Sequence, residues 1–300
     1  MDNIIKYSLG IVMAIASGIF NSLGTVFQKK VVNERKSDEK FVQSLFKNKL
    51  WLAGFLLQLA AGSALFVVAQ TLIGPVLTPG LMATGLIVLA IGAVRIANEK
   101  LGTKEKCGIV LMIMAIAFLG FSNLSVDLSK VDFLDIGFIF RMVTFSGILF
   151  LASVGFRLFA NRKKAYRGVL LSIVAGFMIS LSNFWISVLI GTIVQVFSGN
   201  AILIEWILFI ISAGILIITN LYATIVLQEG FKTGQASTLI PIEQIPIQIT
   251  PIFVYYAVFM AYLMTPVEPL SPVWMVFGVG LIIVSSFMLG EQQAKMEAIK

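Results

Sequence analysis

Long apolar runs separated by short polar loops limit what this chain can fold into. An α-helix needs about 20 mainly apolar residues to cross the hydrocarbon core of a bilayer. Nine successive runs approach or exceed this length, with approximate bounds 7–27, 50–73, 75–96, 106–122, 136–156, 168–189, 203–227, 236–264 and 272–290. Because lipid-exposed backbone must satisfy its own hydrogen bonds, we expect an all-α polytopic membrane protein with about nine transmembrane helices.

The composition agrees with this expectation and excludes several chemistries. Only 12% of the 300 residues are charged and 58% are hydrophobic, whereas about 25% of an average soluble protein is charged. The single Cys107 excludes an internal disulfide, and the absence of histidine removes imidazole metal sites and histidine acid–base catalysis. The first run has no small-residue cleavage site, so we expect it to be retained rather than removed as a signal peptide.

Basic residues fall almost entirely on one side if the loops alternate across the membrane. Of the 22 lysines and arginines, all but Lys6, Lys130 and Arg141 then share the side of the C-terminus. The positive-inside rule places that side in the cytoplasm and the N-terminus outside, as in a multi-pass protein of the cell membrane. The net charge of +7 is thus a topogenic signal, and we expect the lipid bilayer, not nucleic acid, as a partner.

The run 236–264 differs from a lipid-facing helix, because it contains Glu243, Gln244 and Gln248 together with Pro241, Pro246 and Pro251. A carboxylate inside a membrane helix costs about 2.5 kcal/mol or more unless a partner or a wet cavity receives it. Each proline removes one backbone donor and is expected to break or kink the helix. The run indicates either a pathway for a substrate or ion, or a kinked helix whose polar groups bond to neighbours.

The chain resembles itself when it is shifted by 162 residues. The shift aligns the first three runs with the sixth, seventh and eighth, and it pairs Asn21 with Asn183, Gln58 with Asn220, and Pro79 with Pro241. Equivalent helices five spans apart cross the membrane in opposite directions, which predicts an inverted-topology repeat. We expect one membrane domain over 1–300, with half-repeats at 5–122 and 168–290, a connecting helix at 136–158 and a cytoplasmic tail at 291–300.

Polar side chains recur along single helical faces of the repeated runs. Residues three or four apart share a face, and such sets are Ser17, Asn21, Gly24 and Gln28; Ser172, Gly176, Ser180 and Asn183; and Gln244, Gln248, Pro251 and Tyr255. Together with Gln58 and Asn220 they predict a polar cavity between the halves. Close packing of helices through small and polar residues is the alternative explanation.

Motifs for other function classes are missing from the sequence. No phosphate-binding loop of the form Gly-x-x-x-x-Gly-Lys-Ser/Thr occurs, and no Gly-x-Ser-x-Gly nucleophile elbow is present. We therefore expect neither direct use of ATP, nor an enzyme, nor a bound cofactor.

Four stretches resemble the NIPA-type magnesium transporters of the drug/metabolite transporter (DMT, EamA-like) superfamily. They are the segment from Gly18 to Lys30, the Trp-Leu-Ala-Gly at 51–54, the run from Gly74 to Pro79 with Asn-Glu-Lys-Leu at 98–101 and Cys-Gly at 107–108, and Gln-Ala-Ser-Thr-Leu-Ile-Pro at 235–241. The likeness covers nearly the whole chain and implies nine spans with the N-terminus outside. It also points to Thr78, in the first Thr-Pro element, as a pathway residue.

The sequence departs from the family pattern where an ion would bind. Gly62 stands where members often carry an acidic residue, Leu65 replaces a nearby asparagine, and Ile240 replaces the threonine of the second Thr-Pro element. Glu243 is an acid outside that pattern. Because Mg²⁺ usually takes one or two carboxylates and several waters, these departures leave the substrate open.

We therefore expect a secondary transporter that works by alternating access, with Mg²⁺ as its first candidate substrate and Glu243 as the metal ligand. The alternatives are a transporter of a small metabolite or cationic amine, and a non-transporting membrane scaffold or receptor. A homodimer is possible. The expected pathway residues are Asn21, Gln58, Thr78, Asn183, Asn220, Glu243, Gln244, Gln248 and Tyr255.

Overall fold

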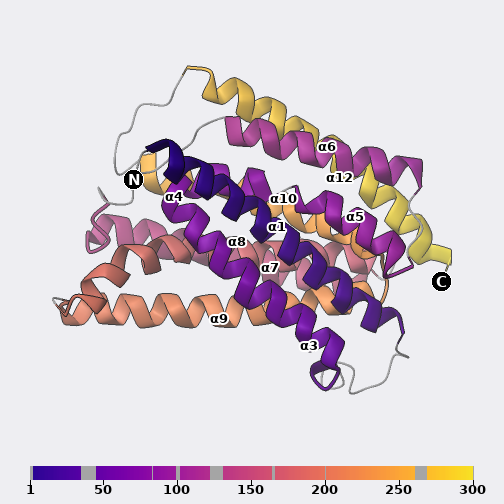
Figure 1. The fold of residues 1–300 in the computed structure, drawn as a ribbon, viewed down its shortest axis with the longest axis horizontal. Coiled ribbons are helices and arrows are strands. Elements are labelled where there is room, and N and C mark those ends of the chain that lie inside the picture. Colours follow the sequence, from indigo (N-terminus) through magenta and orange to yellow (C-terminus); the bar gives the residue numbers. More distant parts are fainter. Residues whose placement is uncertain are drawn as a thin grey trace.

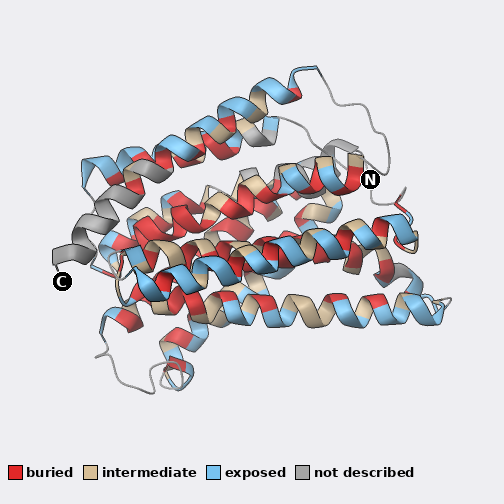
Figure 2. Ribbon diagram, turned by 180° about the vertical axis from the view of Figure 1, so that it is seen from behind, coloured by how far each residue is buried: buried red, intermediate tan, exposed pale blue. Residues whose placement is uncertain are grey.

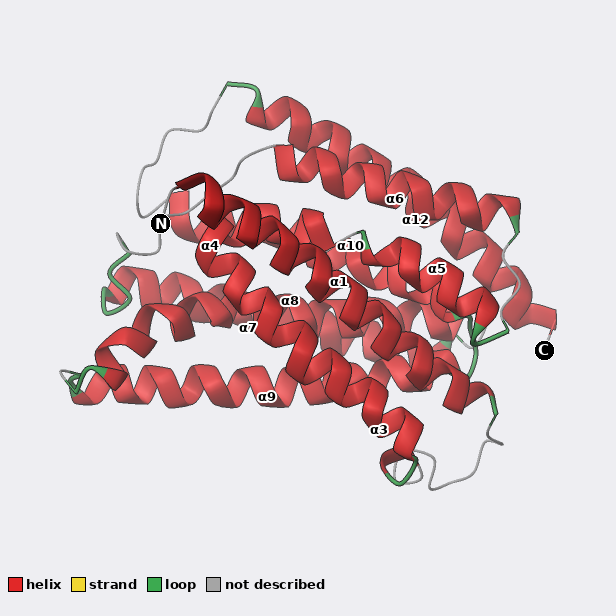
Figure 3. Ribbon diagram, in the orientation of Figure 1, coloured by secondary structure: helices red, strands yellow, loops and turns green. Residues whose placement is uncertain are grey.

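The computed structural model describes residues 3–34, 45–82, 84–98, 102–121, 131–163, 166–199, 201–260 and 269–299. The described residues form helices and turns without a β-strand (Figure 3). In chain order the elements are α1 (Asn3–Asn33), α3 (Lys49–Leu56), η1 (Leu57–Gly62), α4 (Ser63–Met82), α5 (Gly85–Arg95), α6 (Thr103–Phe121), α7 (Ile136–Arg162), α8 (Arg167–Phe197), α9 (Leu203–Phe231), α10 (Ala236–Val254), η4 (Tyr255–Met260) and α12 (Ser271–Ile299) (Figure 1). The two η elements are π-helices.

Several of these helices are long and apolar enough to cross a membrane. Among the described residues, five segments meet both requirements, at Ser8–Asn33, Lys49–Leu72, Ile136–Arg162, Arg167–Phe197 and Leu203–Phe231. Two shorter apolar helices lie at Gly85–Arg95 and Ser271–Ser285. The expected all-α, multi-pass membrane architecture is confirmed at this level.

The outer faces of α7 and α9 carry large apolar side chains that are mostly exposed. Phe140 and Leu151 of α7 are 71% and 68% exposed, and Ile217 and Ile218 of α9 are 61% and 68% exposed. Exposed residues follow the outer helices in Figure 2, whereas buried residues lie on their inner sides. Since soluble proteins seldom expose contiguous apolar patches of this kind, these faces fit a lipid environment.

Helix α1 lies at the centre of one group of helices, because it packs against α3, η1, α4 and α5. The approach is close enough that a Cβ atom at Gly24 would collide with the carbonyl oxygen of Gly54, and a Cβ atom at Gly54 with that of Gly24. A second group forms around α8, which packs against α7, α9 and α10. Helices α6 and α12 pack side by side along one flank of both groups (Figure 1).

The segment from Gly62 to Met82 reverses direction. Ser17 donates a hydrogen bond to the carbonyl of Gly62 at 2.7 Å, and the carbonyl of Met82 touches the next residue of α1, Gly18. A straight helix across these 20 residues would be about 30 Å long, so both ends could not lie beside the same turn of α1. The reversal falls in the stretch where the sequence predicts a break between its second and third apolar runs.

The prolines expected to break helices do not end them. Helix α10 continues through Pro241, Pro246 and Pro251, and Pro79, whose side chain lies outside the described part, falls within the helical bounds of α4. Each proline removes only one donor, and burial of α10 against α8 keeps the remaining helical turns together. Beyond Pro251 the helix widens into the π-helix η4.

One end of the bundle, which we call the basic end, gathers the termini of most helices. Three contacts join helix ends there: Asn33 with the carbonyl of Ala97 at 3.0 Å, Glu105 with Thr238 at 3.0 Å, and Arg157 with Glu229 at 2.8 Å. These contacts join α1 to α5, α6 to α10 and α7 to α9 near their ends. The sequence assigns the same ends to the cytoplasmic side.

Candidate functional site

Glu243 is a buried carboxylate without a counter-charge among its described neighbours. It is 4% exposed on α10, and its Oε1 atom has no hydrogen-bond partner in the described part of the chain. It follows Ala236 by seven residues, or about 10 Å along the helix axis. Because a buried acceptor without a partner costs free energy, a native protein that retains one often uses it for function.

Helix α8 approaches α10 closely at Glu243. A Cβ atom at Gly176 of α8 would collide with the backbone carbonyl oxygen of Glu243 and with the ring of Pro246. Pro246 has no N–H group, so the carbonyl of Ile242 lacks its usual helical donor. The site therefore offers backbone oxygen as well as the carboxylate.

We predict that Gly176→Ala destabilises the protein through this contact. Neither the carbonyl of Glu243 nor the proline ring is a flexible side chain, so the added methyl group forces α8 and α10 apart at a cost of about 1–3 kcal/mol. Thermal unfolding of the detergent-purified protein measures the effect. Gly214→Ala in α9 is the matched control, since its Cβ atom meets nothing within 4 Å; equal melting temperatures for the two variants would contradict the prediction.

Gln244 and Gln248 bond to each other along α10. The Nε2 atom of Gln248 donates to Oε1 of Gln244 at 3.2 Å, and Gln248 is 7% exposed. Further along, Tyr255 is buried and meets Tyr256 edge to face, with ring centroids 5.3 Å apart. Of the predicted polar face of this helix, Gln248 and Tyr255 are thus buried, Gln244 is half-buried and Pro251 is exposed.

A chain of three glutamines connects α1, η1 and α9. Gln28 donates from Nε2 to Oε1 of Gln58 at 3.0 Å, and Gln228 donates from Nε2 to Oε1 of Gln28. Gln28 and Gln228 are almost completely buried, and Oε1 of Gln228 has no partner among the described residues. Gln228 is not among the residues predicted from the sequence, because it stands one residue beyond the predicted end of its apolar run. An amide at that point is the signal that could have found it.

Asn21 bonds within its own helix α1, whereas Asn220 joins α9 to α8. Asn21 donates to the carbonyl of Ser17 at 3.1 Å, and Asn220 donates to Ser182 Oγ at 2.6 Å and to the carbonyl of Leu216 at 2.8 Å. Asn183 is half-buried on α8, and Thr78 is buried on α4. Among the described contacts, Gln58 is the only predicted pathway residue that joins the glutamine chain.

Gly62 has a structural reason for the absence of a side chain. A Cβ atom at Gly62 would lie 2.8–2.9 Å from the amide of Asn21, so Asn21 fills the space that a larger residue would need. The acid that NIPA-type members often carry at this position could fit only if Asn21 moved. The buried carboxylate of this chain lies instead on α10, at Glu243.

Lys29 is a buried cation, although its place in the sequence indicates only a topogenic charge. It is 3% exposed, and its Nζ atom donates to the carbonyls of Phe231 at 2.6 Å and Gly234 at 2.5 Å. The same atom lies 5.4 Å from the centre of the Phe231 ring. A cation is favourable at the C-terminus of a helix, where carbonyls lack donors. Lys29 therefore ties α1 to the end of α9.

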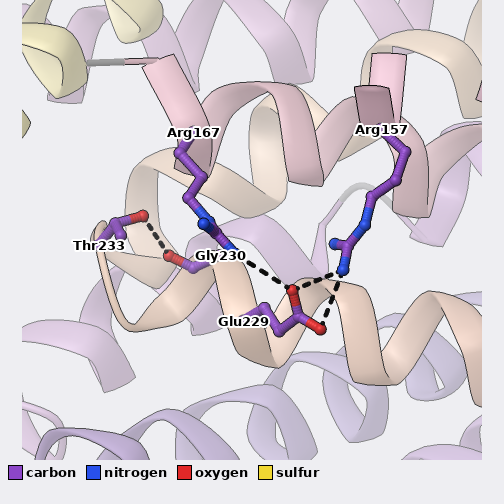
Figure 4. A network of polar contacts seen from close by, with 5 residues as sticks. All are labelled: Arg157, Arg167, Glu229, Gly230 and Thr233. Atoms are coloured by element: carbon purple, nitrogen blue, oxygen red, sulfur yellow. Dashed lines mark hydrogen bonds and ion pairs between the residues drawn. The ribbon is translucent and has the colours of Figure 1, made fainter. Parts of the chain in front are cut away.

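Glu229 holds two arginines at the basic end (Figure 4). Arg157 of α7 approaches its carboxylate at 2.8 and 3.2 Å, and Arg167 of α8 approaches it at 3.6 Å. Thr233 donates to the adjacent carbonyl of Gly230 at 2.9 Å. Burial lowers the pKa of Lys232 and Arg167 lowers it further, whereas the nearby Glu229 opposes the shift.

Comparison with known proteins identifies no relative of this chain. No protein-family model matches it, and neither a curated protein nor a solved structure gives a match. The resemblance to NIPA-type transporters stays a prediction from the sequence. The function is therefore inferred from the buried carboxylate of Glu243 and the polar contacts around it.

Proposed function

We propose that this protein is a secondary transporter that binds a cation at Glu243 and releases it on the other side of the membrane by alternating access. The observation that carries the proposal is the buried Oε1 of Glu243, which has no partner among the described residues. A cation that enters the site supplies the missing charge. Such a carboxylate inside a membrane helix is typical of substrate and ion pathways.

Mg²⁺ is the first candidate substrate, and its coordination chemistry suits the oxygens near Glu243. Mg²⁺ takes oxygen ligands, often one or two carboxylates together with retained waters. Glu243 supplies the carboxylate, while Gln244, Gln248 and the carbonyl of Ile242 lie within one or two helical turns of it. The two amides bond to each other at 3.2 Å, and a bound ion with its waters would replace that contact.

The inverted repeat belongs to the same proposal, in the nine-span form expected from the sequence. Its support is the packing of helices that a 162-residue shift makes equivalent. Helix α1 packs against α3–α4 and α5, as α8 packs against α9 and α10, and α6 packs against α12. In transporters with inverted repeats the substrate binds between the halves near the membrane midplane.

Contacts between the two halves offer a way to close the pathway at the basic end, which we take as cytoplasmic. Gln28 and Lys29 belong to the first half, and they bond to Gln228, Phe231 and Gly234 of the second. Alternating access requires such contacts to form in one state and to break in the other. The sidedness of the termini, outside for the N-terminus and cytoplasmic for the C-terminus, is part of this proposal.

A small organic cation is the second candidate, and the aromatic pair beyond Gln248 favours it. Tyr255 follows Gln248 by seven residues and therefore shares its side of the helix, and it meets Tyr256 edge to face. An ammonium group can bind a carboxylate at one end of such a site and an aromatic face at the other.

A ligand screen on the purified protein distinguishes these candidates. Thermal unfolding is followed with Mg²⁺, Ca²⁺ and a series of primary to quaternary amines, and a ligand at 100 times its dissociation constant should stabilise the folded state by about 2.7 kcal/mol. We expect Mg²⁺ to raise the melting temperature. Stabilisation by amines alone would assign the organic substrate, and no stabilisation by any cation, with no flux into vesicles, would favour a scaffold or receptor.

A further inference from the structure

A partly buried cluster at the basic end carries more positive than negative charge. It consists of Arg157, Arg167, Glu229 and Lys232, contributed by the end of α7, the start of α8 and the end of α9. One carboxylate thus faces three cations. The side chains of Arg157 and Glu229 are only 25% and 23% exposed and that of Arg167 is 38% exposed, whereas Lys232 is exposed. Solvent therefore screens the charges of the two arginines incompletely.

The arginines retain unused binding capacity. Arg157 directs Nη2 to Glu229, but its Nη1 atom is buried without a hydrogen-bond partner in the described part of the chain. Arg167 is held more loosely, at 3.6 Å from the carboxylate. It is also the first residue of α8, where free backbone N–H groups and the helix dipole favour an anion. The carbonyls of Phe231 and Gly234, at and just beyond the end of α9, already accept hydrogen bonds from Lys29.

The surroundings indicate where the anion comes from. Leu158 and Phe159, next to Arg157 on α7, are 58% and 60% exposed, and Tyr166, next to Arg167, is 51% exposed. These side chains would contact acyl chains and the interfacial layer, where tyrosine is enriched. A phosphate on a lipid can reach the arginines while its chains lie against α7, whereas a soluble anion gains nothing from this apolar surface.

From this geometry we infer that Arg157, Arg167 and Lys232 form a binding site for the phosphate headgroup of an anionic phospholipid at the basic end. The guanidinium groups suit bidentate recognition of phosphate. Glu229 competes with the lipid phosphate for both arginines, and it holds them together when no lipid is bound. The site does not depend on the proposed transport function, because it lies at the ends of α7, α8 and α9, whereas Glu243 lies inside α10.

The test measures phospholipid binding to the full chain in detergent by native mass spectrometry. Phosphatidylglycerol and phosphatidylcholine are compared, with and without inorganic phosphate as a soluble competitor. We expect the wild type to prefer phosphatidylglycerol, and Arg167→Gln to weaken this binding about fivefold, the effect of one basic residue near a membrane surface. Glu229→Gln should strengthen the binding, because the competing carboxylate is lost.

The paired variant Arg162→Gln with Lys163→Gln is the control, since it removes two exposed charges from the same end of α7. A loss of binding in this control as large as in Arg167→Gln would show a diffuse charge effect and would overturn the site. Unchanged or weaker binding by a folded Glu229→Gln protein would also overturn it. Full displacement of the lipid by millimolar inorganic phosphate would assign the cluster to a soluble anion.

Discussion

Glu243→Gln should reduce cation flux to near the background of empty vesicles while leaving the fold intact. The two side chains have almost the same shape, but the amide carries no charge with which to bind a cation. Because Oε1 of Glu243 is buried without a partner among the described residues, removal of the charge relieves a desolvation cost. We therefore expect the melting temperature of the variant to be equal to or above that of the wild type.

Flux into proteoliposomes, matched for the amount of inserted protein, measures this effect. Glu205→Gln is the control variant. Glu205 lies near the exposed start of α9, where its carboxylate accepts a hydrogen bond from the backbone N–H of Ile202 at 2.9 Å. The control should transport normally. A Glu243→Gln protein with undiminished flux would show that the carboxylate has no part in transport.

Lys29→Met should destabilise the protein strongly, although it removes a charge from a largely apolar helix. Methionine keeps most of the side-chain volume but leaves the buried carbonyls of Phe231 and Gly234 without the donor they have at 2.6 and 2.5 Å. A buried acceptor left without its partner costs about 1–3 kcal/mol. We expect a clear fall in the melting temperature of the purified protein, and proteolysis should begin near the junction of α9 and α10.

The control for this variant is Lys47→Met, which removes an exposed lysine from the same predicted side of the membrane. Both changes reduce the topogenic charge by one, so a shared effect on insertion cancels. If the two variants unfold at the same temperature, the contacts of Lys29 contribute no net stability. The prediction for Lys29 would then be wrong.

The sequence was sufficient for the features that depend on hydrophobicity along the chain. Apolar runs of membrane-spanning length predicted an all-α membrane protein, because only helices satisfy backbone hydrogen bonds in lipid without a partner strand. The same pattern drew attention to Glu243, since a carboxylate inside an apolar run is costly wherever the helix is placed. Its burial in the fold agrees with that expectation.

Tertiary structure was needed for each feature that depends on pairs of residues far apart in the chain. Lys29 and Arg157 look alike in sequence, as basic residues near the ends of apolar runs, yet Lys29 is buried against α9 whereas Arg157 keeps a guanidinium nitrogen without a described partner. Gln228 joins Gln28 across 200 positions, and Asn21 fills the space beside Gly62. Hydrophobic periodicity specifies which side of a helix is buried, but the partner of a buried polar group is decided by which helices pack against one another.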